Sequence, residues 1–181
     1  MGIVSMAWVP RIPEVKAQFG LSDGGLGFVL LGSTCGALIG SQFGGRLAHI
    51  YGTKKVSTLG AFLMSSGLFL MGSAHQILQL FGGLFVMGFG YVMLDICVNT
   101  QAVAVEKLLD KRWMSTFHGT WSVGSFVATV TGGVVAHAIS AQSELRVVAI
   151  IALVLYMPGI YYLLGNEDDG HKGDDETSEG K

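Results

Sequence analysis

The sequence predicts an all-α integral membrane protein that crosses the bilayer with six helices. Of its 181 residues, 50% are hydrophobic, only 13% are charged, and 27 are glycine. Soluble domains average about 25% charged residues and about 7% glycine, whereas helices in lipid are apolar and tolerate glycine. This balance argues against a soluble enzyme, a nucleic-acid-binding protein and a disordered chain.

Uncharged stretches between the charged residues define the six helices. Five of them are long enough to cross the hydrocarbon core, which takes about 20 helical residues. The first is about half that length, and Trp8, Pro10 and Pro13 indicate an interface anchor followed by a break. We therefore expect the first helix to be truncated, with its missing part upstream of Met1. The predicted helices cover residues 1–10, 24–47, 56–74, 77–105, 113–141 and 147–165.

The short connections between these helices differ in charge. One side of the membrane receives Arg46, Lys54, Lys55, Lys107, Lys111 and Arg112, and the other receives Arg11, Lys16 and Arg146. Because cytoplasmic loops are enriched in basic residues, the richer side is predicted to be cytoplasmic. Both termini would then lie in the cytoplasm, with the helices in the inner membrane. Residues 167–181 are rich in Asp and Glu and are predicted to form an acidic, disordered cytoplasmic tail or linker.

Two predicted helices carry a small residue at every fourth position, which places these residues along one helix face. Small residues let helix backbones approach closely, and such packing holds helices together in lipid. We expect these two helices, the second and the fifth, to pack tightly with each other or with a partner. The third and sixth helices lack such a stripe and are expected to face lipid. The two stripes are Gly32, Gly36, Gly40 and Gly44, and Gly124, Ala128, Gly132 and Ala136.

One acidic residue lies inside a predicted span. Asp95 is the only formal charge between Ile77 and Val105, and a carboxylate in hydrocarbon is costly unless it faces a cavity or a partner. Tyr91 and Asn99 lie one helical turn before and after Asp95 and share its face. A carboxyl group in a cavity could load and release protons. The alternative is that a neighbouring helix satisfies Asp95, which then never titrates.

A second row of polar residues follows the fifth predicted helix. It comprises His118, Ser122, Ser125 and Thr129, with Trp121 beside it. Histidine titrates near neutrality and tryptophan can stack on a sugar or an aromatic ligand, so this row could share a substrate cavity with Asp95. Alternatively, the hydroxyls only hold helices together and His118 lies near the membrane interface. The sequence has no metal-ligand spacing, nucleophile motif or phosphate loop, so we expect no metal, no cofactor and no enzymatic activity.

The connection between the second and third helices resembles the signature loop of the major facilitator superfamily. In that loop, two glycines nine positions apart precede an Asp, a basic residue, a further glycine and a basic cluster. The matching positions here are Gly36, Gly45, Gly52, Lys54 and Lys55, while His49 and Ile50 replace the Asp and the basic residue. In the family this Asp helps to hold the outward-facing state, so the departure puts that latch in doubt here. Residues 8–13, 21–27 and 114–124 look like a bacterial branch that is loosely similar to fucose permeases.

The resemblance covers residues 1 to about 165 and implies one six-helix half of a major facilitator fold. In the family, helices one and four line the central cavity, helices two and five lie between two halves, and helices three and six face lipid. The implied function is secondary active transport of a small solute by alternating access. A cavity holding Tyr91, Asp95, Asn99, His118 and Trp121 would bind the solute, and Asp95 could couple its movement to a proton.

A complete family member has two such halves, whereas this chain has room for one. We expect a second six-helix half, which is either the missing C-terminal half of a longer transporter or another copy of this chain, and we favour the former. The expected partners are thus the lipid bilayer, a small solute, a proton and the second half, with no nucleic acid. The alternative function is a non-transporting helix bundle or an inactive fragment that only pairs with a partner.

Overall fold

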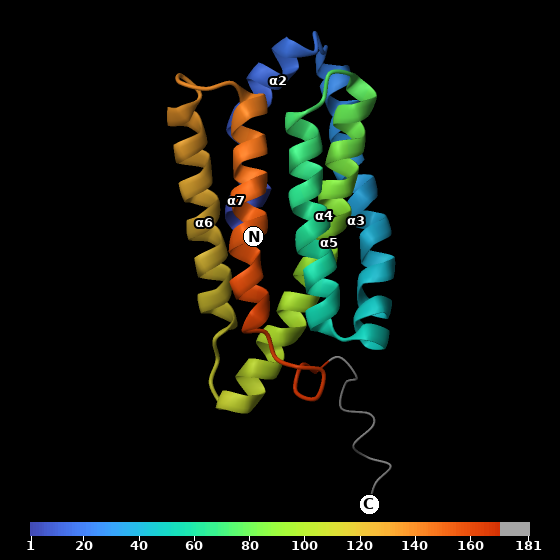
Figure 1. Ribbon diagram of the computed structural model, residues 1–181, viewed down its shortest axis with the longest axis vertical. Helices are drawn as coiled ribbons and strands as arrows, with labels where there is room; N and C mark the ends of the chain where they lie inside the picture. The colour runs from blue at the N-terminus through green and yellow to red at the C-terminus, as the bar shows by residue number, and fades with distance from the viewer. Residues whose placement is uncertain (171–181) are drawn as a thin grey trace, which may run out of the picture.

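The computed structural model describes residues 1–170, and within them the regular structure is entirely helical (Figure 1). Four of these helices are long and apolar enough to cross a membrane, namely α3, α4, α5 and α7. The remaining residues, 171–181, belong to the predicted acidic tail and lie outside the described part of the chain. The elements are α1 (Gly2–Met6), the 3-10 helix η1 (Val9–Arg11), α2 (Ile12–Gln18), α3 (Asp23–Tyr51), α4 (Thr53–Gly72), α5 (Ile77–Leu109), α6 (Met114–Val135) and α7 (Ala141–Tyr161).

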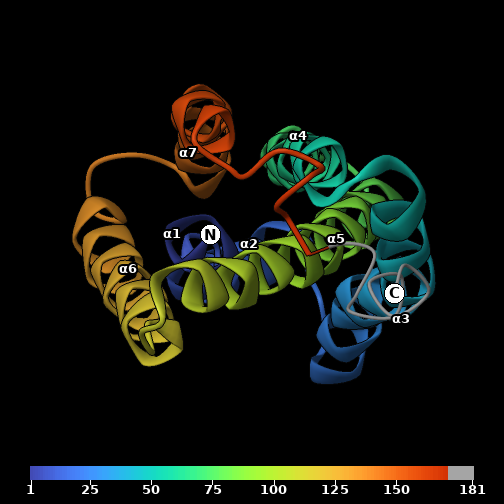
Figure 2. The ribbon, with the colours of Figure 1, turned by 90° about the horizontal axis from the view of Figure 1, so that it is seen from below.

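The longest helix, α5, is the centre of the bundle. It packs along both α3 and α4, and α4 in turn packs against α7. Seen along the helix axes, α5 runs between α3 and α6, with α4 and α7 together on one side (Figure 2). Helix α6 has few contacts with α5 and is held mainly by α1 and η1. The bundle therefore consists of a tight group, α3, α4, α5 and α7, and a looser pair, α1 and α6.

The glycine stripe of α3 is filled by the backbone of α5. A methyl group on Gly36 would lie 2.0 Å from the Phe85 carbonyl oxygen, and one on Gly40 would lie 2.7 Å from that of Phe89. Such distances are far below van der Waals contact, so only glycine lets these helices approach so closely. Within the described residues this stripe therefore packs against α5 and not against α6, the fifth predicted helix. Helix α5 stands between α3 and α6 and takes that face.

The stripe of α6 is also used within the chain, but by the first helix. Gly124 lies beside Ile3, and a methyl group on Gly132 would lie 2.7 Å from the Pro10 ring. Ala128 is buried in the same contact, whereas Ala136, at the end of the stripe, is exposed. The α3 stripe thus contacts α5, and the α6 stripe contacts the first helix over most of its length.

Helix α4, which was expected to face lipid, is the most enclosed of the four apolar helices. About 56% of its most apolar stretch is buried, compared with 22% for α3 and for α7. Its own glycines explain this, because methyl groups on Gly60 and Gly67 would lie 2.7 and 2.3 Å from backbone nitrogens of α5. These two glycines are seven residues apart, a spacing that a search for every fourth position misses. Helix α7 carries the expected exposed apolar face, formed by Ile150, Val154, Leu155 and Met157.

The boundary between the last two helices differs from the predicted one. Helix α6 ends at Val135 rather than near residue 141, and α7 begins at Ala141 rather than at 147. The side chain of Ser140 caps α7 by accepting a hydrogen bond from the Ser143 amide, so the polar residues that follow form its first turn. A polar first turn is normal for a helix, and charge alone was a poor guide to this boundary. Helix α6 is also not among the four apolar helices, although a fifth full span was predicted there.

Candidate functional site

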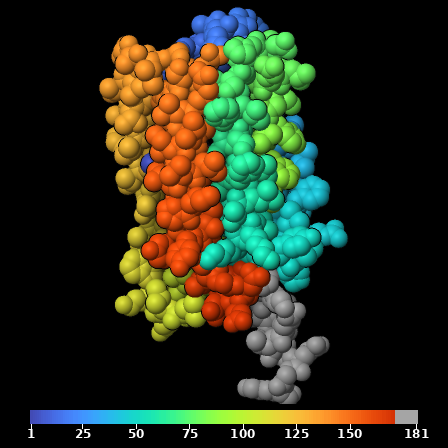
Figure 3. Space-filling view, viewed as in Figure 1, coloured from blue at the N-terminus to red at the C-terminus, as the bar shows by residue number. Residues whose placement is uncertain are grey.

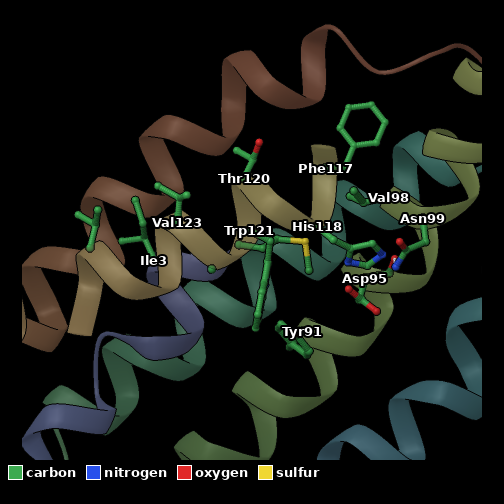
Figure 4. A pocket seen from close by; sticks show the side chains of 14 residues that line it. Ile3, Tyr91, Asp95, Val98, Asn99, Phe117, His118, Thr120, Trp121 and Val123 are labelled. Atoms are coloured by element: carbon green, nitrogen blue, oxygen red, sulfur yellow. The ribbon is translucent and has the colours of Figure 1, made fainter. Parts of the chain in front are cut away.

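A cavity of about 710 Å³ lies between α5 and α6 and is bordered by the start of the chain. It brings together all five side chains that the sequence analysis proposed for a solute cavity (Figure 4). The rest of its lining is mainly apolar, which is the usual make-up of a small-molecule pocket with a few polar groups. The lining includes Tyr91, Asp95, Val98 and Asn99 from α5 and Phe117, His118, Trp121 and Val127 from α6.

The α5 side of the cavity follows directly from helical spacing. Tyr91, Asp95 and Asn99 are four residues apart, so they project from one face, and all three are partly buried. The side-chain amide of Asn99 donates a hydrogen bond of 2.9 Å to the backbone carbonyl of Asp95. Among the described residues, the carboxylate of Asp95 has no ion-pair partner within 4 Å. A carboxylate without a salt bridge thus faces the cavity.

The α6 side contributes an imidazole and an indole. His118 is exposed and faces Asp95 across the cavity, close enough for the two side chains to interact electrostatically (Figure 4). The indole nitrogen of Trp121 is buried beside the Tyr91 phenol, without a well-aligned hydrogen bond. The cavity therefore combines a carboxylate, an imidazole and aromatic surfaces.

The hydroxyl residues of α6 do not point their hydrogen bonds into the cavity. Ser122 donates to the carbonyl of His118, Ser125 to that of Trp121, and Thr129 to that of Ser125, all at 2.9 to 3.0 Å. Ser and Thr often bond back to their own helix in this way. These three residues bond within their own helix, and of this row only His118 and Trp121 line the cavity.

A second cavity, of about 480 Å³, shares two of these side chains. Tyr91 and Trp121 line both cavities, and the second one also touches Ser5, Ser33 and Thr34. Its walls come from α1, α3, α4 and α5 as well as from α6. Tyr91 and Trp121 therefore lie between the two cavities. The sequence alone did not predict the second cavity.

The residues of the family-like loop are not brought together with this cavity. Gly36 lies in the middle of α3, while Gly45 and His49 are exposed near the end of that helix. Gly52 joins α3 to α4 with a backbone φ of +86°, a conformation that residues other than glycine rarely adopt. The ammonium group of Lys54 donates to the carbonyls of Tyr161 and Leu163, and Lys55 is exposed. The loop thus contacts the end of α7 at the lower end of the bundle in Figure 1.

Sequence reasoning missed one buried charge cluster. Arg11 was taken as a loop charge, but its side chain is fully buried and forms ion pairs with Glu14 at 2.6 Å and Glu144 at 3.1 Å. Arg11 also donates to the Ile139 carbonyl, and Glu14 accepts from the Ala141 amide at the start of α7. Glu144 lies 133 residues after Arg11 in the chain and meets it only in the fold, so no local sequence pattern predicts this cluster. Within residues 1–170 no group of three or more His, Cys, Asp or Glu side chains could hold a metal.

Comparison with known proteins decides the family. The profile of the Major Facilitator Superfamily matches residues 1–180, nearly the whole chain. The chain belongs to this superfamily. It is therefore a membrane protein of a transporter family rather than an enzyme, and the cavity between α5 and α6 lies between helices four and five of its six-helix half.

Three curated relatives of this superfamily member come from bacteria. The membrane protein MosC of Rhizobium meliloti is 31% identical over 134 residues, which is 74% of this chain and 33% of MosC. An uncharacterised MFS-type transporter of Yersinia pestis is 29% identical over 175 residues, 95% of this chain and 45% of that protein. The uncharacterised transporter y4wD of Sinorhizobium fredii is 34% identical over 131 residues, 72% of this chain and 35% of y4wD.

The chain spans between a third and a half of the length of these relatives. No solved structure matches it significantly. The family is thus shown by the sequence comparisons, and the arrangement of the cavity comes from the structure itself.

Proposed function

We propose that this chain forms one six-helix half of a secondary active transporter, and that the cavity around Asp95 is its part of the solute site. The observation that carries the proposal is the gathering of Tyr91, Asp95, Asn99, His118 and Trp121 around one cavity. A bundle that only held a partner would have no need for a carboxylate without a salt bridge in its interior. Alternating access around such a midplane site is the way transporters of this type move solutes.

The proposed solute is a small polar molecule. Trp121 and Tyr91 offer aromatic faces on which a sugar ring could stack, and Asn99 and Asp95 offer hydrogen-bonding groups beside them. The ionisable side chains of the cavity lining are Asp95, His118 and the Tyr91 phenol. We infer the loose similarity to fucose permeases from residues 8–13, 21–27 and 114–124 alone, and on that basis propose a neutral, hydroxylated solute.

Asp95 is the proposed proton carrier. It faces the cavity, lacks an ion pair within 4 Å among the described residues, and has His118 opposite it. A carboxyl group in that position can take up a proton from water in the cavity and pass that proton to the His118 imidazole. Proton movement would then accompany solute movement.

A second six-helix unit completes the proposed cavity, either as the C-terminal half of a longer product or as another copy. The mass of the native gene product distinguishes these two, because the present chain accounts for 19.2 kDa and a complete two-half transporter for about twice that. In the proposed orientation the chain leaves α7 on the cytoplasmic side of the inner membrane, whereas Met1 lies part-way along the bundle, beside the cavity (Figure 1). The lower end in Figure 1 carries the two connections that are rich in Lys and Arg, which supports this orientation.

The test is solute-driven proton movement in liposomes that contain the native gene product. A pH-sensitive dye inside the vesicles reports proton flux while monosaccharides, polyols, amines and carboxylates are added in turn. We expect at least one neutral hydroxylated solute to drive proton flux, and Asp95→Asn to abolish that flux. Asp110→Asn is the matched control, because Asp110 follows the end of the same helix and lies outside the cavity.

Three results would count against the proposal in different ways. Solute uptake without proton movement would remove the coupling role of Asp95 and keep the transport role. Equal flux in wild type and Asp95→Asn would do the same. Absence of uptake for every solute class would favour the non-transporting helix bundle.

A further inference from the structure

The segment that follows α7, residues 163–170, folds back against the start of α4. Asp169 lies in this segment and its side chain is fully buried, although the sequence placed it in a disordered acidic tail. One of its carboxylate oxygens accepts hydrogen bonds from the Thr53 backbone amide at 2.8 Å and from the Thr53 hydroxyl at 2.7 Å. Thr53 is the first residue of α4. The amides of a first helical turn lack partners inside the helix and carry partial positive charge, so a carboxylate is well placed there.

Helix α5 is fastened to the same point by Gln101. Its buried side-chain amide donates to the Thr53 hydroxyl at 2.8 Å and to the Leu164 carbonyl at 3.0 Å. Its carbonyl oxygen accepts from the Leu164 amide at 2.8 Å. The amide nitrogen and the amide oxygen of the Gln101 side chain thus connect α5 to α4 and to the segment after α7.

Two further contacts hold this segment in place. Lys54 donates to the carbonyls of Tyr161 and Leu163, which lie at and just beyond the end of α7 and have no amide partner in a further helical turn. Gly52 approaches Asn166 so closely that a methyl group there would lie 2.2 Å from the side-chain oxygen of Asn166. In the space-filling view, the segment lies directly below the lower ends of α7 and α4 (Figure 3).

We propose that Asp169, Thr53 and Gln101 form a releasable fastener that positions the segment leading out of α7. While the Asp169 carboxylate holds the start of α4, the ends of α4, α5 and α7 behave as one unit with this segment. Loss of the carboxylate frees residues 163–170 and leaves the helix packing above them intact. The fastener is a property of this chain alone, and only its consequence for transport rests on the function proposed above.

Breaking the Asp169–Thr53 hydrogen bonds would affect the lower end of the bundle. These bonds join the connection between α3 and α4 to the chain that leaves α7, so the two parts cannot separate while the bonds are formed. Asp169 is a positioning residue in this view, since it lies far along the chain from the cavity residues and is not part of the cavity lining. Its release would alter how readily the lower end rearranges during a transport cycle, without altering what the cavity binds.

Amide hydrogen exchange of the full chain in detergent micelles tests the fastener directly. In Asp169→Ala we expect the Thr53 amide and the peptide covering residues 163–170 to exchange at least about tenfold faster, which is the loss expected for one charge-assisted hydrogen bond. Asp168→Ala is the matched control, because Asp168 is the neighbouring acid and is exposed. Peptides from the middle of α4 and α5 should exchange at the wild-type rate in both variants.

A second pair of variants separates the hydroxyl from general destabilisation. Thr53→Ser keeps the hydroxyl that links Asp169 to Gln101 and should retain protection, whereas Thr53→Val keeps the side-chain shape and should lose it. The proposal is overturned if residues 163–170 exchange equally fast in wild type and Asp169→Ala, or if Asp168→Ala has the same effect. It is also overturned if protection falls along the whole of α4 and α5, since the bonds would then be ordinary parts of the fold. A negative transport assay leaves each of these readings unchanged.

Discussion

Replacing Gly36 with alanine should separate α3 from α5 and destabilise the bundle. The added methyl group would lie 2.0 Å from the Phe85 carbonyl oxygen and 2.9 Å from its carbonyl carbon. Ordinary contact begins at 3.4 Å, so the two backbones must move apart by about 1.4 Å along this line. The obstacle is backbone in the middle of a helix, which cannot turn aside as a flexible side chain can.

The magnitude follows from what this separation costs. Overpacking a well-packed interior costs about 1–3 kcal/mol, and the upper part of this range applies because the close contacts at Gly32 and Gly40 are lost together with that at Gly36. Alanine also favours the helix over glycine by about 1 kcal/mol, so the net loss is about 2 kcal/mol. Gly45→Ala is the matched control, since Gly45 lies in the same helix with nothing within 4 Å of the added methyl group. Because both variants share the helix gain, their difference isolates the clash at about 3 kcal/mol, roughly a hundredfold in the unfolding equilibrium.

The assay is reversible unfolding in mixed detergent micelles, followed by circular dichroism as the fraction of denaturing detergent rises. Gly36→Ala should unfold at a lower fraction than wild type, and Gly45→Ala at the same or a higher one. Equal midpoints for the two variants would refute the reasoning, because the α3 stripe would then not be in backbone contact with α5.

Two further predictions concern the ends of the bundle. Arg11→Met should destabilise the chain by about 3–5 kcal/mol in the same unfolding assay, because it leaves the buried carboxylate of Glu144 without its partner. Adding Glu144→Gln should recover part of this lost stability. If it recovers none, Arg11 acts through packing alone. The orientation in the membrane can be tested with Gln76→Cys and Lys111→Cys, made one at a time in a Cys35→Ser background that lacks the exposed native thiol. Both positions are exposed and lie at opposite ends of the bundle. A maleimide that cannot cross the membrane should label the cysteine at position 76 and not that at 111 in intact cells, and the opposite pattern would reverse the proposed topology.

The neighbours of each side chain along its own helix could be predicted from sequence. Tyr91, Asp95 and Asn99 share one face because four residues make about one helical turn, and this holds in any fold that keeps α5 helical. The same reasoning placed His118 one turn before Ser122 but could not tell that the Ser122 hydroxyl bonds back to the His118 carbonyl. The gathering of both rows around one cavity needed the arrangement of α5 and α6, which spacing within a helix does not encode.

What the sequence by itself determined is the class of the protein and the register of its helices. Half of its residues are hydrophobic, and uncharged runs of about 20 residues satisfy their backbone in lipid by forming helices. What only the tertiary structure decided is which surface each helix meets. The α3 stripe meets α5, Arg11 meets Glu144, and Asp169 meets Thr53 across 116 residues. These pairings depend on how backbones pack in three dimensions and on the cost of leaving a buried charge unpaired, and neither quantity can be read from a local run of residues.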